Sequence, residues 1–140
     1  MTKRMAIAAS LLAAACASGG GGSEGIVDFS AQVQPTAGNQ VRGTANAVSA
    51  IGETAVTLEI QNATPGANHP WHVHSGQCGT NGPVVGGGSN YPALTVGADG
   101  RARAVATIPV ALDDDAPYFV NVHQSSQAMG TIVSCGALVD

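Results

Sequence analysis

The 140-residue sequence predicts a single all-β domain, a β-sandwich or flattened barrel of about seven or eight short antiparallel strands. Three observations lead to this fold class. Apolar and polar residues alternate in several short segments, turns rich in Gly, Pro and Asn separate these segments, and no convincing amphipathic helix follows residue 25.

The first half of the domain contains three alternating segments, at residues 29–33, 41–47 and 54–61. In the third segment Val56, Leu58 and Ile60 fall on one face, because successive side chains on a strand point to opposite faces. A further strand is expected around residues 72–74, where two histidines flank a valine.

In the second half, residues 94–96 and 101–108 flank a turn that ends in Asp99-Gly100, which predicts a β-hairpin. Residues 118–123 and 131–139 supply the last two strands. Residues 82–90 are expected to form an irregular loop, with Val84 and Val85 packed into an edge of the core.

Residues 1–15 predict a secretory signal peptide, because Lys3 and Arg4 precede an apolar run that is too short to span a bilayer as a helix. Residues 12–16 resemble a bacterial lipobox, although the Leu lies one place further from Cys16 than usual. Cys16 would then be lipidated and become the mature N-terminus. The alternative is an Ala-x-Ala cleavage site at residues 15–17, which discards Cys16.

The Gly/Ser-rich run up to residue 25 favours the lipoprotein, because such a tether is flexible and holds a domain away from a membrane. The predicted organisation is therefore a signal peptide (1–15), a lipidated Cys16 with its tether (16–25) and a β domain (26–140). The protein is expected to be exported and lipid-anchored in a bacterial cell envelope. From Cys16 on, three arginines face nine acidic residues, a net charge of −6, which argues against a nucleic-acid partner.

Cysteine content adds a covalent link. Without Cys16, only Cys78 and Cys135 remain, and an exported protein meets an oxidising compartment, so a disulfide is predicted. Closing so long a loop would stabilise the fold by about 4 kcal/mol. The alternative is two free thiols, one of them a metal ligand.

Three histidines are the candidate metal ligands of this sequence. His72 and His74 share one strand face with Cα atoms about 7 Å apart, so both imidazoles can reach one metal ion; many such pairs nevertheless bind nothing. His123, at the end of strand 118–123, would complete a three-imidazole site suited to copper or zinc. Met129, shortly after His123, is a candidate thioether ligand, or it simply covers the barrel end.

The histidine motifs resemble those of copper/zinc superoxide dismutases. His69-Pro-Trp-His-Val-His74 is similar to their copper-binding strand (H-G-F-H-V-H), Val120-Asn-Val-His123 to the strand of their last copper ligand, and Ser134-Cys135-Gly136 to their C-terminal A-C-G. The resemblance covers about residues 41–140. It implies a Greek-key β-barrel, one copper ion on His72, His74 and His123, His69 as a hydrogen-bonding support, and a disulfide between Cys135 and Cys78.

Departures from that family leave catalysis open. The family's bridging histidine is Val84 here and no further zinc ligands follow, so no zinc is expected. The segment between His123 and Cys135 is too short for the family's charged loop, and Ile132 replaces its active-site Arg. The expected partner is therefore superoxide, or a copper donor or acceptor if the domain stores or delivers copper.

A second resemblance is to the chordin-type CHRD domain. It rests on Asn81-Gly-Pro-Val-Val85 after the H-x-H strand and on the later V-x-V-H. This resemblance implies a structural or interaction domain that holds no metal.

Overall fold

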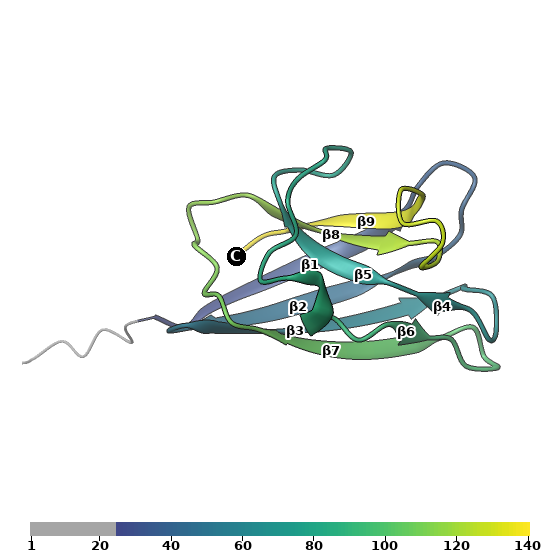
Figure 1. Cartoon of the computed structure of the whole chain (residues 1–140), viewed down its shortest axis with the longest axis horizontal. Coiled ribbons are helices and arrows are strands. Elements are labelled where there is room, and N and C mark those ends of the chain that lie inside the picture. Colours follow the sequence, from purple (N-terminus) through teal and green to yellow (C-terminus); the bar gives the residue numbers. More distant parts are fainter. Residues whose placement is uncertain (1–24) are drawn as a thin grey trace, which may run out of the picture.

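The computed structural model describes residues 25–140, which form an almost entirely β domain. Seven strands make one antiparallel sheet in the order β5-β8-β9-β1-β2-β3-β7, and β4 pairs with β6 in a small second sheet. The large sheet curls into a half-barrel, with β8 and β9 above β3 and β7 in the view of Figure 1. The strands are β1 (Val27–Pro35), β2 (Arg42–Ala50), β3 (Glu53–Gln61), β4 (Asn68–His69), β5 (Trp71–Ser75), β6 (Leu94–Thr95), β7 (Ala102–Ile108), β8 (Tyr118–His123) and β9 (Ile132–Leu138), with one short 3₁₀-helix, η1 (Gly88–Asn90).

The predicted all-β fold class is confirmed. In the strand order β9-β1-β2-β3, a strand that arrives by a long connection lies beside the first of three consecutive strands, which is the Greek-key arrangement. The predicted signal peptide, Cys16 and tether lie outside the described residues. Within residues 25–140, no helix is long and apolar enough to cross a membrane.

Alternation along the strands builds the core. In β3, Val56, Leu58 and Ile60 are buried, whereas the residues between them reach the outer face. Trp71 and Val122 lie opposite each other on β5 and β8 and are fully buried inside the half-barrel. The inner face therefore supplies the packing, which leaves the outer face of β5 and β8 for polar side chains.

The predicted hairpin at residues 94–108 is wrong in its pairing. The turn forms, since the Gly97 N–H donates to the Arg101 carbonyl at 2.9 Å, but β6 pairs with β4 and β7 pairs with β3. The Val96 N–H donates to the Ala67 carbonyl at 2.9 Å, which holds the chain before the turn against the segment beside β4. Turn residues specify a chain reversal, whereas distant partners decide which strands pair.

The loop expected at residues 82–90 runs for part of its length alongside β5. The Val85 N–H donates to the Val73 carbonyl at 2.9 Å, and the Ser75 N–H donates to the Pro83 carbonyl at 3.0 Å. Val85 packs into the core as expected, but Val84 is 37% exposed, so its predicted burial is wrong. The two valines differ because neighbours on an extended segment point to opposite sides.

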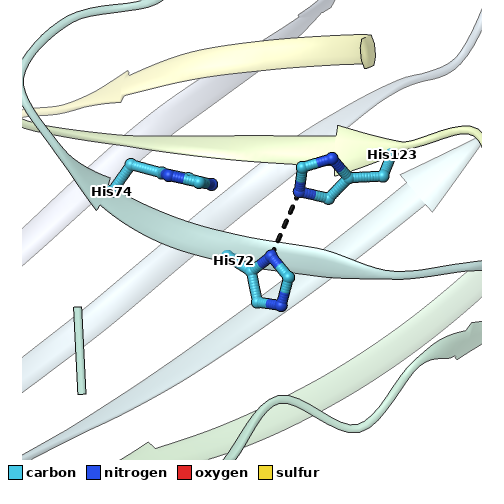
Figure 2. Close-up of side chains that lie close together, drawn as sticks. All are labelled: His72, His74 and His123. Carbon is cyan, nitrogen blue, oxygen red and sulfur yellow. Dashed lines mark hydrogen bonds between the residues drawn. The ribbon is translucent and has the colours of Figure 1, made fainter. Parts of the chain in front are cut away.

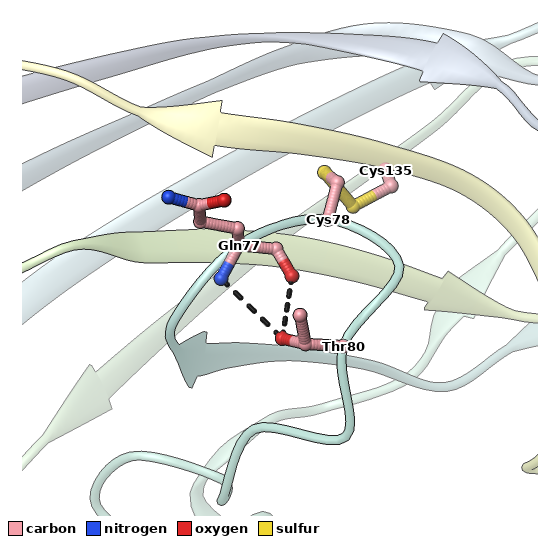
Figure 3. Close-up of a disulfide and its surroundings, with 4 residues drawn as sticks. All are labelled: Gln77, Cys78, Thr80 and Cys135. Carbon is pink, nitrogen blue, oxygen red and sulfur yellow. Dashed lines mark hydrogen bonds between the residues drawn. A yellow bond between two sulfur atoms is a disulfide. The ribbon is translucent and has the colours of Figure 1, made fainter.

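The predicted disulfide between Cys78 and Cys135 is present, with Cα atoms 6.0 Å apart. It fastens the turn after β5 to β9 (Figure 3). Within that turn the Thr80 hydroxyl donates to the Gln77 carbonyl at 2.7 Å. The disulfide and this turn fix the chain just before residues 82–85, the segment that runs beside His74 on β5.

Candidate metal centre

Two histidines of β5 point away from the core. Strand β5 pairs with β8 so that His72 lies opposite Asn121 and His74 opposite Phe119. Trp71 and Val73 occupy the alternate positions and are fully buried. The predicted division of β5 into one packing face and one histidine face is therefore present in the fold.

His123 joins this face from the end of β8. The pairing of β8 with β9 shifts register between Val122 and His123, so that Val122 lies opposite Ser134 but His123 lies opposite Ile132. The backbone N–H of His123 donates to the Pro70 carbonyl at 2.8 Å, which connects the end of β8 to the start of β5. Since Asn121 lies opposite His72, alternation along β8 places His123 on the same face as the two histidines of β5.

The three imidazoles converge. One ring nitrogen from each of His72, His74 and His123 lies within 4.8 Å of the others, and this buried group could hold a metal ion. Figure 2 shows the rings of His74 and His123 directed toward the space beside His72, with His72 Nδ1 and His123 Nε2 3.1 Å apart. Metal–nitrogen bonds near 2.1 Å require ligand nitrogens no more than about 4.2 Å apart, so the rings would move slightly closer together around an ion.

Backbone carbonyls determine which nitrogen each ring offers. His74 Nδ1 donates to the Gly82 carbonyl at 2.8 Å, and His123 Nδ1 donates to the Met129 carbonyl at 2.6 Å. Each donation leaves Nε2 with a free lone pair. His72 Nδ1, which faces His123 Nε2, therefore carries the shared proton of that pair while no ion is bound.

Packing fixes the planes of the rings. The His74 ring stacks on Phe119 with centroids 5.1 Å apart, and His72 meets the edge of Tyr91 at 5.2 Å. Tyr91 is held in turn, because its hydroxyl donates to the Val85 carbonyl at 2.8 Å. Ligand rings anchored in this way need little reorganisation to bind an ion.

Burial keeps His72 and His123 uncharged near neutral pH. Burial and the neighbouring rings of His123 and His74 lower the pKa of His72 from 6.5 to about 4. Burial also lowers the pKa of His123, against the opposing effect of its hydrogen bond to Met129. Neutral imidazoles are the form that binds metals, and His72 Nδ1 can bind one once its proton moves to Nε2 of the same ring, with no net proton release.

Two further predicted residues lie beside the cluster. His69 Nδ1 donates to the His123 backbone carbonyl at 2.9 Å, a contact with the backbone of a cluster residue and not with its ring. Met129 contacts His123 through its backbone carbonyl, and its side chain is 37% exposed. The structure therefore gives Met129 an orienting contact that the sequence did not indicate.

A cavity of about 410 Å³ adjoins the cluster through His74, and we call it the side cavity. Its lining includes Asn121, Thr80, Asn81 and Met129, and contains no Asp, Glu, Lys or Arg. Sequence reasoning missed Asn121, although its position two residues before His123 on the same strand already placed both on one face. It also missed Gly82, whose role lies in a backbone carbonyl that no side-chain motif reveals.

Fold and cluster together define a β half-barrel protein with three buried histidines that could hold a metal ion. No known family model matches the chain, and no curated protein matches its sequence.

Proposed function

We propose that this protein binds one copper ion through His72 Nδ1, His74 Nε2 and His123 Nε2. The observation that carries the proposal is the convergence of three buried imidazoles, in two of which, His74 and His123, the second ring nitrogen donates to a backbone carbonyl. Support of this kind orients ligand rings and raises their basicity.

Copper is the favoured ion. Imidazoles accept both copper and zinc, but a given nitrogen site binds Cu²⁺ more tightly than Zn²⁺. Copper bound here would supply one-electron redox chemistry. The chain's own residues would hold the ion, keep its ligands deprotonated and exclude bulk water from one side through Phe119 and Tyr91.

The proposed protein is an envelope-anchored copper protein of the superoxide-dismutase type, with superoxide as its candidate substrate. An anionic substrate is captured faster by a positive funnel. The uncharged side cavity offers no such funnel, and this favours a second candidate, a protein that stores copper or delivers it to an acceptor without turnover. A CHRD-like structural domain that binds no metal is the third candidate.

Copper titration separates these candidates. The metal-free protein should bind one Cu(II) per chain, measured by its visible and EPR spectra, and a variant with His72→Ala, His74→Ala and His123→Ala should bind none. His69→Ala is the matched control, because His69 contacts His123 only through its backbone carbonyl, and this variant should keep one ion per chain. Equal binding by the triple variant and the wild type would refute the proposal.

A superoxide-decay assay on the copper-loaded protein then distinguishes an enzyme from a carrier. Decay faster than that produced by the same copper in a chelating buffer would support dismutation. Decay no faster than that, together with complete copper transfer to a competing chelator, would support storage or delivery.

A further inference from the structure

The outer face of the large sheet carries a second cavity, of about 330 Å³, at the end where β1 finishes and β2 begins. We call it the arginine cavity. Hydrogen-bonding and cationic side chains dominate its lining, which includes Gln32, Gln34, Arg42, Thr44, Gln61 and Arg101. Its volume is within the range of small-molecule sites, and its lining suits a polar ligand.

Sheet register places Arg42 and Arg101 on either side of Gln61. Arg42 on β2 pairs directly with Gln61 on β3. Arg101 precedes Ala102, which pairs with Ile60, so Arg101 lies beside Gln61 from the direction of β7. Two interstrand spacings separate the arginine Cα atoms, about 10 Å in total. Both long side chains border the same cavity and can reach one ligand between them.

Neither of these two arginines has an ion-pair partner among residues 25–140. The one salt bridge within that range joins Arg103 Nε to Glu59 Oε1 at 3.1 Å. Glu59 lines the arginine cavity, so this pair neutralises the acidic side chain in its wall. Arg42 and Arg101 are both exposed, which leaves their guanidinium groups accessible to a ligand.

The acidic surplus of the domain lies mostly away from this cavity. Glu53, on the same strand as Gln61, precedes it by eight residues, which is about 26 Å along a strand. Charges so far apart are largely screened, because the Debye length is about 8 Å at physiological ionic strength. Asp99 is nearer, since its carboxylate accepts the backbone N–H of Arg101 at 3.1 Å. Three arginines against Glu59 and Asp99 still leave a local net charge of +1.

Charge and hydrogen-bonding capacity indicate the ligand class. A phosphate monoester carries a charge of about −1.5 to −2 near pH 7 and three acceptor oxygens, which matches two unpaired guanidinium groups. Each guanidinium can donate two parallel hydrogen bonds to phosphate oxygens. The glutamine amides and the Thr44 hydroxyl both donate and accept, as sugar-like hydroxyl groups require.

We propose that the arginine cavity binds a small hydroxylated phosphate monoester. Arg42 and Arg101 hold the phosphate group, and the neighbouring glutamines hold the hydroxyl groups. No histidine lines this cavity, so the site is separate from the histidine cluster and the inference does not depend on copper binding.

Three sugars of similar size test the ligand class. The metal-free protein, in a buffer without phosphate or sulfate, is titrated separately with glucose 6-phosphate, glucuronate and glucose. Binding is followed by the NMR signals of the arginine side-chain N–H groups.

Glucose 6-phosphate should shift the Nε–H signals of Arg42 and Arg101. It should bind about tenfold more tightly than glucuronate, whose carboxylate carries one charge, and glucose should leave both signals in place. Arginine signals that ignore glucose 6-phosphate would overturn the site. Equal affinity for glucuronate would overturn the assignment to phosphate.

Arg42→Gln and Arg101→Gln should each weaken the binding of glucose 6-phosphate by about tenfold, the lower end for a hydrogen bond to a charged group, because both side chains are exposed. Thr107→Glu is the matched control. It lowers the net charge by the same amount on the same outer face, but Thr107 lies opposite Ala55, toward the far end of β7 from Arg101. This control should keep the wild-type affinity, and an equal loss in it would overturn the inference, since net charge alone would then explain the binding.

Discussion

Gly82→Ala tests whether the backbone of residues 82–85 orients the histidine cluster. A Cβ atom at position 82 would lie 1.8 Å from the Ser75 carbonyl oxygen and 3.2 Å from Phe119 Cε1. Contacts under 3.0 Å essentially never occur, so the segment must move away from β5 by about 1.2 Å. That movement stretches the 2.8 Å hydrogen bond from His74 Nδ1 to the Gly82 carbonyl.

Two losses should follow from this shift. Overpacking lowers the free energy of unfolding by about 1–3 kcal/mol. Loss of the carbonyl that orients His74 should weaken copper binding by about 10- to 100-fold. The first is measured by urea denaturation of the metal-free protein, and the second by competition with a chelator of known copper affinity.

Gly130→Ala is the matched control, because Gly130 also lines the side cavity but has no atom within 4 Å of an added Cβ. It should leave both quantities unchanged. Wild-type copper affinity in Gly82→Ala, or an equal loss in Gly130→Ala, would refute the claim that the Gly82 carbonyl positions His74.

Three further outcomes are expected. The metal-free protein should lose up to about 3 kcal/mol of stability as the pH falls from 6.5 to 4, because His72 takes up a proton in the unfolded chain, whereas in the folded protein its pKa is lowered to about 4. Urea denaturation should show that the free energy of unfolding depends less steeply on pH in His72→Gln than in the wild type. An equal pH dependence would contradict the assignment to His72. Replacing both Cys78 and Cys135 by Ser should lower the free energy of unfolding by about 4 kcal/mol relative to the oxidised wild type. A loss below about 1 kcal/mol would mean that the loop closed by the disulfide is already restrained in the unfolded chain. Met129→Leu should keep the wild-type copper(I) affinity, because the contact with His123 comes from the backbone, whereas a clear loss would identify the thioether as a ligand.

Periodicity explains how much of the fold the sequence predicted. A period of two residues placed Val56, Leu58 and Ile60 in the core and put His72 and His74 on one face, and both assignments need only the local geometry of a strand. The pairing of Cys78 with Cys135 followed from counting, since only these two cysteines remain once Cys16 is set aside.

The predicted pairing of β6 with β7 was wrong because the local sequence does not specify which strands pair. Asp99-Gly100 predicts a reversal, but β6 pairs with β4, whose residues precede their partners by 25 and 27 positions. Local turn chemistry carries no information about such partners.

The sequence by itself therefore determined the all-β class, the histidine face of β5 and the pair of cysteines, because strand periodicity and residue counts are properties of the chain. Tertiary structure alone decided that β8 pairs with β5 in the register that brings His123 to that face, and that the Gly82 and Met129 carbonyls determine the free nitrogen of each ring. It also left Asn121 Oδ1 without a partner beside them. These features depend on where backbone carbonyls point after distant strands have paired, and no side-chain pattern along the chain records that direction.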